Sequence, residues 1–146
     1  MTTPVENLKK FVRCSQLGVP PEKDVICWLG DRLNAVLVHR VSSFEEAFGL
    51  QNLRGGVPWW LESAMQERNK ALRELARYHL ADQTRTQQAR TITTLSSRYM
   101  ASAWRFDKNR PEMPMRYHGR PQEWLWQAFK SGASMPLSER QLRNIL

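Results

Sequence analysis

Cysteine is scarce in this chain, and long apolar runs are absent. Cys14 and Cys27 are the only cysteines in 146 residues and no histidine cluster accompanies them, which excludes a zinc knuckle and a disulfide framework. We interpret both as reduced thiols. The longest aliphatic run, residues 35–38, is far too short to cross a bilayer, and no apolar segment of signal-peptide length follows Lys9 and Lys10. We therefore expect a cytoplasmic protein without a membrane partner.

Catalytic and cofactor-binding motifs are also missing. The pair Gly55-Gly56 lacks the Lys-Ser/Thr that completes a phosphate-binding loop. His39, His79 and His118 have no neighbour in the sequence that would orient them as a catalytic base. Acidic pairs that share a helix face lack the Glu-x-x-His companion of a metal site in a helix bundle. We predict that the protein is not an enzyme and has no catalytic residue, no metal site and no cofactor.

Acidic residues are absent between Gln83 and Phe106, although this segment contains four arginines. The remaining charge is just as uneven: residues 1–53 have six basic and six acidic residues, whereas residues 54–146 have sixteen and eight. The second part therefore carries the whole net charge of +8. A one-sided positive field attracts polyanions, and nucleic acid is the commonest large one.

The hydrophobic pattern is helical throughout. Apolar residues make up 41% of the chain, which excludes disorder along its whole length, and no stretch alternates as a strand would. Ser43, Thr84 and Ser138 are each followed three positions later by Glu or Gln, the spacing of a capping box. We predict an all-α fold, a compact bundle of six to seven helices. The expected helices cover residues 5–16, 21–38, 43–49, 58–81, 85–106, 122–131 and 138–146.

The segment Gly55-Gly56-Val57-Pro58 is the clearest internal boundary, because two glycines loosen the chain before a proline restarts it. It separates a neutral N-terminal segment, residues 1–53, from a basic helical body, residues 54–146. We expect the first to pack on the second within one globular domain. The helices at 58–81 and 85–106 are joined by about three residues, which predicts an antiparallel hairpin.

The last two predicted helices have the outline of a helix-turn-helix unit. Ala128 and Gly132 have the four-residue spacing common in that motif, and Leu137 and Leu142 flank the Ser138 cap as a hydrophobic staple. A terminal helix pair that simply closes the core explains the same residues, so both interpretations stay open. Under the first, four exposed side chains would read base edges in the major groove, namely Arg140, Gln141, Arg143 and Asn144.

Further basic residues are candidates for phosphate contacts, because arginine and lysine are the usual partners of phosphate oxygens. The alternative is a solvated helix face, or ion pairs with Glu62, Glu67 or Glu74 of the preceding helix. The candidates are Arg85, Arg90, Arg98, Arg105, Arg120 and Lys130.

These patterns predict a non-enzymatic protein that binds double-stranded DNA and has a regulatory role. A short recognition helix reads few base pairs, so specific binding would call for a homodimer. The alternative is a protein-interaction or inhibitor module that binds an acidic protein partner. Exposed tryptophans beside the neutral N-terminal segment would suit that second function.

Several stretches carry a resemblance to other sequences: Trp60, ERNKALREL at residues 67–75, QAR at 88–90, Arg98-Tyr99, Trp104-Arg105, and PLSERQLRNIL at 136–146. Over residues 57–146 the chain resembles a group of short uncharacterised helical proteins of bacteria that often occur in prophage or mobile-element surroundings. The resemblance implies a bacterial or phage origin. It implies no particular activity and no site residues.

Overall fold

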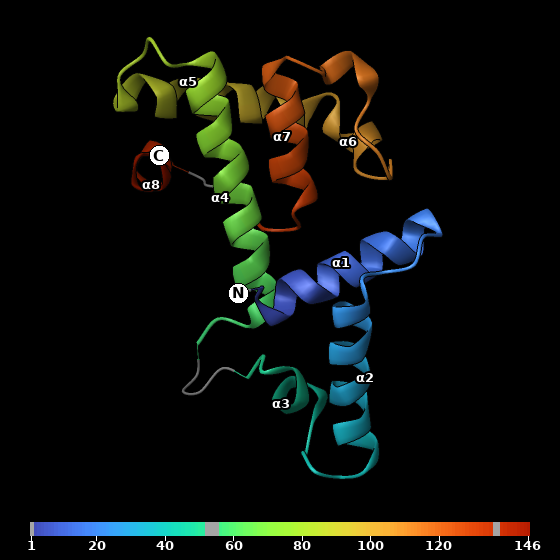
Figure 1. Ribbon diagram of the computed structural model, residues 1–146. Coiled ribbons are helices and arrows are strands. Elements are labelled where there is room, and N and C mark those ends of the chain that lie inside the picture. The colour runs from blue at the N-terminus through green and yellow to red at the C-terminus, as the bar shows by residue number, and fades with distance from the viewer. Residues whose placement is uncertain (1, 52–55, 136–137) are drawn as a thin grey trace. The chain divides into compact units, whose positions relative to one another are not determined.

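The computed structural model describes residues 2–51, 56–135 and 138–146 (Figure 1). Within these ranges the chain forms α-helices and one 3-10 turn but no strand, which confirms the all-α prediction. None of the helices in this part of the chain is both long and apolar enough to span a membrane. The elements are α1 (Pro4–Leu17), α2 (Lys23–Leu37), α3 (Phe44–Phe48), α4 (Trp59–His79), α5 (Arg85–Ala101), α6 (Trp104–Asp107), η1 (Met115–Tyr117), α7 (Pro121–Lys130) and α8 (Glu139–Ile145).

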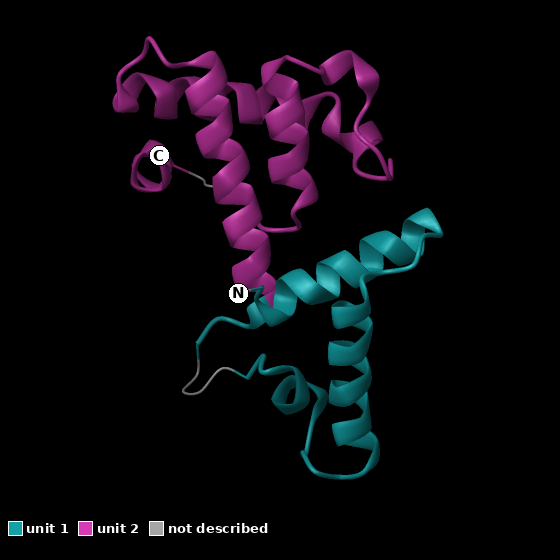
Figure 2. Cartoon of the chain, in the orientation of Figure 1, with its two compact units in different colours: residues 1–59 teal, residues 60–146 magenta. Residues whose placement is uncertain are grey.

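The chain divides into two compact units, Met1–Trp59 and Trp60–Leu146 (Figure 2). The first contains α1, α2, α3 and the first residue of α4, and the second contains the rest of α4 and the later helices. The expected packing of residues 1–53 on the basic body stays a prediction. Gly55, which belongs to the predicted boundary motif, lies outside the described residues.

The helices of the N-terminal unit begin and end at local signals. Thr3 and Glu6 form a reciprocal capping box at the start of α1, and Gly18 ends that helix in the left-handed conformation with a φ of 66°. The Ser43 hydroxyl accepts from the Glu46 backbone N–H, as predicted, but the Glu46 carboxylate accepts from Ser42 instead of completing the box. Local sequence therefore sets these boundaries.

Each of the four longest helices of the C-terminal unit contributes at least one large side chain to the core. Five of these side chains are at most 2% exposed, namely Leu72 and Leu75 of α4, Ile92 of α5, Leu125 of α7 and Leu142 of α8. Burial of one such side chain stabilises a fold by about 1.5–3 kcal/mol. Apolar residues recur at steps of three and four over the predicted helix 85–106, and of these Ala89, Ile92 and Tyr99 are buried, whereas Phe106 is 64% exposed.

The predicted helix over 85–106 is wrong beyond Ala101. The backbone breaks at Ser102 (φ −118°, ψ −84°), whose hydroxyl donates to the Arg98 carbonyl at 2.7 Å, and α6 follows as a single turn. The break allows Trp104 to pack against Phe129 of α7, with ring centroids 5.3 Å apart. The free energy gained by packing this aromatic ring exceeds the cost of ending the helix at Ala101.

The predicted antiparallel hairpin of α4 and α5 is also wrong, because α5 runs across α4 and not beside it (Figure 1). The connection itself forms as expected. Thr84 and Gln87 make a reciprocal capping box, and the Gln88 amide donates to the Leu80 carbonyl at 2.8 Å. Beyond this turn α5 packs against α6, α7 and α8, so tertiary contacts set its direction.

Helix α8 packs mainly on α5, and not on α7 as a helix-turn-helix pair would. An ion pair between Arg90 and Glu139, 3.5 Å apart, joins α5 to α8, and the Arg73 Nε donates to the Ile145 carbonyl at 2.8 Å. The segment before α8 is held to α4 by the buried Arg68, which donates to the Ser134 carbonyl. This packing agrees with the second interpretation of the terminal helices, in which they close the core. Leu137 of the predicted staple lies outside the described residues.

Candidate nucleic-acid interface

A cavity of about 430 Å³ lies between α5, η1 and α7, and three arginines line it. Arg98 comes from the last turn of α5, Arg116 from η1, and Arg120 from the position just before α7. The rest of the lining is apolar, aromatic or neutral, with Leu95, Ala103 and Leu125 among the apolar residues, and it contains no carboxylate. The cavity therefore combines three positive charges with an uncharged wall. We call it the arginine pocket.

Two of the three arginines have uncompensated charge. Arg98 and Arg120 form no ion pair with any residue in the described part of the chain. Arg116 is different, because its Nη2 donates to the Tyr117 hydroxyl at 3.2 Å and lies 3.8 Å from the Asp107 Oδ1. Its guanidinium also lies over the Tyr117 ring, 4.9 Å from the centroid. The pocket thus has one fixed arginine and two that are available to an anion.

A buried carboxylate lies next to the pocket and links two tyrosines that line it. Asp107 is 0% exposed, and its Oδ2 accepts from the hydroxyls of Tyr99 at 2.9 Å and Tyr117 at 2.6 Å. Its Oδ1 accepts no hydrogen bond within the described residues but lies 3.5 Å from the Arg110 Nε. A buried carboxylate is tolerated only when hydrogen bonds and opposite charges compensate its desolvation. We call this set of residues the Asp107 network.

The Asp107 network changes the acidity of both tyrosines. Burial raises the pKa of Tyr99 well above its ordinary value, and the hydrogen bond to Asp107 raises it further. The pKa of Tyr117 is raised for the same reasons, in the same order. In each case the phenolate would be desolvated and would face a carboxylate, so the neutral phenol is favoured.

We expect stability to fall at alkaline pH because of these two tyrosines. A group whose pKa is raised by folding stabilises the fold fully below its unfolded pKa, about 10 for tyrosine, and loses that contribution as the pH rises through the folded value. Urea midpoints measured from pH 8 upward should decrease above about pH 10. The decrease should be smaller in Tyr99→Phe. An equal decrease in that variant would contradict this assignment.

The four candidates on α8 are all exposed, as a base-reading face requires. However, the Gln141 Oε1 accepts from the Ser138 backbone N–H at 3.2 Å, and the Ser138 hydroxyl accepts from the Gln141 N–H at the same distance. The Gln141 side chain therefore caps α8. Arg140, Arg143 and Asn144 remain as the side chains whose outward positions suit contact with a ligand.

The phosphate candidates on α5 and α6 are exposed but do not share one environment. Arg90 lies in the ion pair with Glu139, and the Arg105 guanidinium lies over the Phe106 ring, 4.7 Å from its centroid. Arg85 begins α5, whereas Arg98 lines the arginine pocket in its last turn. Of the predicted phosphate contacts, the structure brings Arg98 and Arg120 together.

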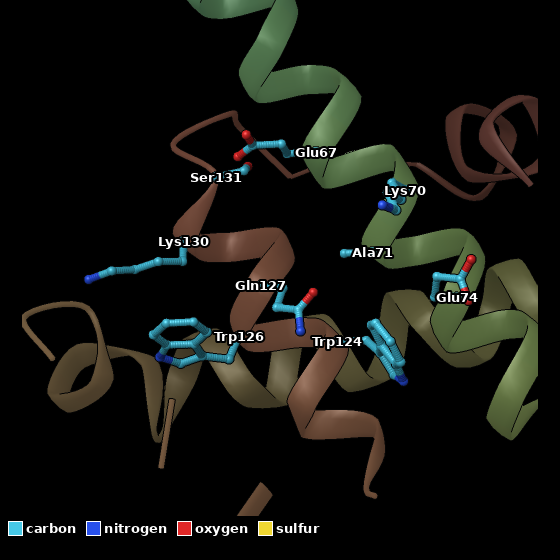
Figure 3. Close-up of a pocket in the computed structure, with 9 residues that line it drawn as sticks. All are labelled: Glu67, Lys70, Ala71, Glu74, Trp124, Trp126, Gln127, Lys130 and Ser131. Atoms are coloured by element: carbon cyan, nitrogen blue, oxygen red, sulfur yellow. The ribbon is translucent and has the colours of Figure 1, made fainter. Parts of the chain in front are cut away.

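Lys130 lies apart from the arginine pocket, at a second cavity of about 340 Å³ between α4 and α7 (Figure 3). Its ammonium group donates to the carbonyls of Lys108 and Arg110 at 2.9 and 2.7 Å. These two hydrogen bonds hold the segment after α6 to the end of α7. Glu67, Glu74 and Lys70 also line this cavity, so its charges balance. It lacks the positive excess that a phosphate site requires.

The sequence interpretation missed Arg116 and Asp107. Asp107 is the first acid after the long acid-free segment, and tyrosines lie eight residues before it and ten residues after it. These spacings match no helical repeat, so the sequence carries no signal that Asp107 is buried between the two tyrosines. Comparison of the chain with protein-family models, curated proteins and solved structures found no match.

Proposed function

We propose that the C-terminal unit binds double-stranded DNA through its phosphate backbone. The observation that carries this proposal is the arginine pocket, where Arg98 and Arg120 have no carboxylate partner in the described structure and no acid lines the wall. Arginines that lack an internal partner are free to replace the counterions of a polyanion. The +8 net charge, which residues 54–146 supply, adds long-range attraction.

Base contacts are assigned to α8 in this proposal. Arg140 and Arg143 are exposed there, and arginine pairs with the guanine edge in the major groove. Since α8 packs on α5, the unit departs from the standard helix-turn-helix arrangement, and we expect weak sequence preference from one copy. The regulatory role, the homodimer, and the prophage or mobile-element origin remain part of the same proposal.

The test is a titration of labelled duplex DNA at several salt concentrations. We expect binding at micromolar protein and about 50 mM salt, with an affinity that falls steeply as salt increases. The double variant Arg98→Gln/Arg120→Gln should reduce the slope of log K against log salt by about 2, or about 1 for each phosphate that is no longer neutralised. Absence of binding by the native protein under these conditions would refute the proposal.

Two matched variants separate the roles. Arg140→Gln/Arg143→Gln should reduce discrimination between sequences. Arg13→Gln/Arg32→Gln changes two exposed arginines of the neutral N-terminal unit and should lower affinity and slope much less than the pocket variant does. All three variants lack two positive charges of the native chain. An equal decrease in affinity in all of them would indicate attraction by net charge alone and would remove the pocket from the proposal.

A protein-interaction function is the second candidate, and exposed apolar side chains of the N-terminal unit favour it. Leu17 is 65% exposed and Leu37 is 78% exposed. Val12, Val19, Ile26 and Phe44 of this unit are also exposed, and a large exposed apolar surface is typical of protein interfaces. Replacing both leucines with Gln should abolish partner capture under this candidate and leave DNA binding unchanged under the first.

A further inference from the structure

We propose that the arginine pocket binds the terminal phosphate of a nucleotide, with the attached sugar and base against the apolar wall. The proposal rests on the proposed function in one respect, since the end of a DNA strand is the expected source of that phosphate. A free nucleotide offers the same chemistry. The class of ligand is therefore a nucleoside phosphate monoester.

The pocket can take a backbone phosphodiester, as in the proposed function, but a terminal phosphate monoester neutralises more of its positive charge. A monoester carries a charge of about −1.5 to −2 near neutral pH, and a phosphodiester carries −1. Arg98 and Arg120 supply two positive charges that no described carboxylate neutralises, whereas Asp107 partly compensates Arg116. A dianion would balance the two free arginines without recruiting another ion.

The fixed arginine gives the pocket a preorganised donor. Arg116 is held by its hydrogen bond to Tyr117, by its position over that ring and by its ion pair with Asp107. A guanidinium presents several N–H donors in one plane, and they match two oxygens of a phosphate. A donor already held in place loses less conformational entropy when the ligand binds.

The size and the wall of the pocket suit the rest of a nucleotide. Its volume of about 430 Å³ lies within the range of small-molecule sites, about 300–1,000 Å³. Leu95, Ala103 and Leu125 provide apolar contact, and the Gln122 amide provides donors and an acceptor near the three cations. Inorganic phosphate would leave this apolar surface unused. A nucleoside without phosphate would leave the arginines unpaired.

The experiment measures binding of short single strands that carry either a 5′-phosphate or a 5′-hydroxyl, together with free deoxynucleoside monophosphates and inorganic phosphate. We expect the phosphorylated strand to bind about tenfold more tightly than its hydroxyl counterpart, because it alone brings the charge-assisted contacts of a terminal phosphate. Arg98→Gln and Arg120→Gln should each remove most of this preference. Arg77→Gln, an equal charge change at an exposed arginine outside the pocket, should retain it.

Closed circular DNA, which has no strand ends, separates this inference from the proposed function. If the native protein binds circular DNA but shows no preference for the 5′-phosphate, the pocket inference is wrong and the proposed function stands. If it binds deoxynucleoside monophosphates through Arg98 and Arg120 but binds no DNA, the proposed function is wrong and the free nucleotide is the ligand. A 5′-phosphate preference that survives Arg98→Gln/Arg120→Gln would also overturn the inference. The far-UV circular dichroism spectrum of each variant, compared with that of the native protein, tests whether the variant is folded.

Discussion

Replacing Leu142 with Ala is expected to lower the free energy of unfolding of the C-terminal unit by about 3 kcal/mol. Leu142 is 2% exposed and belongs to the same buried cluster as Ile92 of α5 and Leu72 of α4. Truncation of its side chain removes apolar burial and leaves a cavity. The helix has only seven residues, too few to be stable without tertiary contacts. Urea unfolding followed by tryptophan fluorescence measures the change.

Leu61→Ala is the matched control, because this leucine of α4 is 40% exposed. We expect it to cost less than about 1 kcal/mol, since a partly solvated side chain loses less burial and leaves no closed cavity. The circular dichroism of Leu142→Ala should also show a decrease in helix content before the main transition, as α8 detaches. Equal costs for the two variants would contradict the docking of α8 on the core.

Replacing Asp107 with Ala should have a comparable effect, about 3 kcal/mol, for an electrostatic reason. The change leaves the hydroxyls of Tyr99 and Tyr117 without an acceptor in a buried site, and it removes the charge that balances Arg110 and Arg116. Asp107→Asn keeps an acceptor oxygen and should cost less. The free energy of unfolding from urea titration at neutral pH measures both variants.

The tyrosines provide the internal control for this prediction. In the triple variant Asp107→Ala/Tyr99→Phe/Tyr117→Phe no hydroxyl of these tyrosines remains unsatisfied, so we expect it to be more stable than Asp107→Ala alone. A general packing defect would instead make three substitutions worse than one. That outcome, or a cost of Asp107→Ala below about 0.5 kcal/mol, would rule out a stabilising role for the Asp107 network.

The parts of the fold that depend on neighbouring residues were predictable from the sequence. The capping boxes at Thr84 and Ser138 form as expected, and Gly132 follows α7 with a φ of 86°. The three- and four-residue spacing of apolar side chains correctly placed Ala89, Ile92 and Tyr99 on the buried face of α5. Each of these features depends on residues at most four positions apart, which is the distance over which sequence patterns carry information about helices.

Features set by residues far apart in the sequence were not predictable. The break at Ser102 contradicts a helical pattern that continues to Phe106, because Trp104 gains a partner in Phe129 of α7. The arrangement of the candidate site likewise depends on residues that are far apart in the sequence. Arg98 and Arg120 were identified as candidates from their charge, but their proximity depends on how α5 and α7 pack. Arg140 and Arg143 were placed correctly at the surface, although α8 docks on a different helix from the one expected.

The single turn of α6 makes the number of residues between Ser102 and Asp107 critical. The helix ends at Asp107, whose carboxylate must point toward two phenols at once. One residue inserted between Ser102 and Asp107 would rotate that carboxylate about the helix axis by about 100° and aim it away from both rings. In this stretch the exposed side chains of Arg105 and Phe106 can be exchanged, whereas a single insertion or deletion would disrupt the Asp107 network.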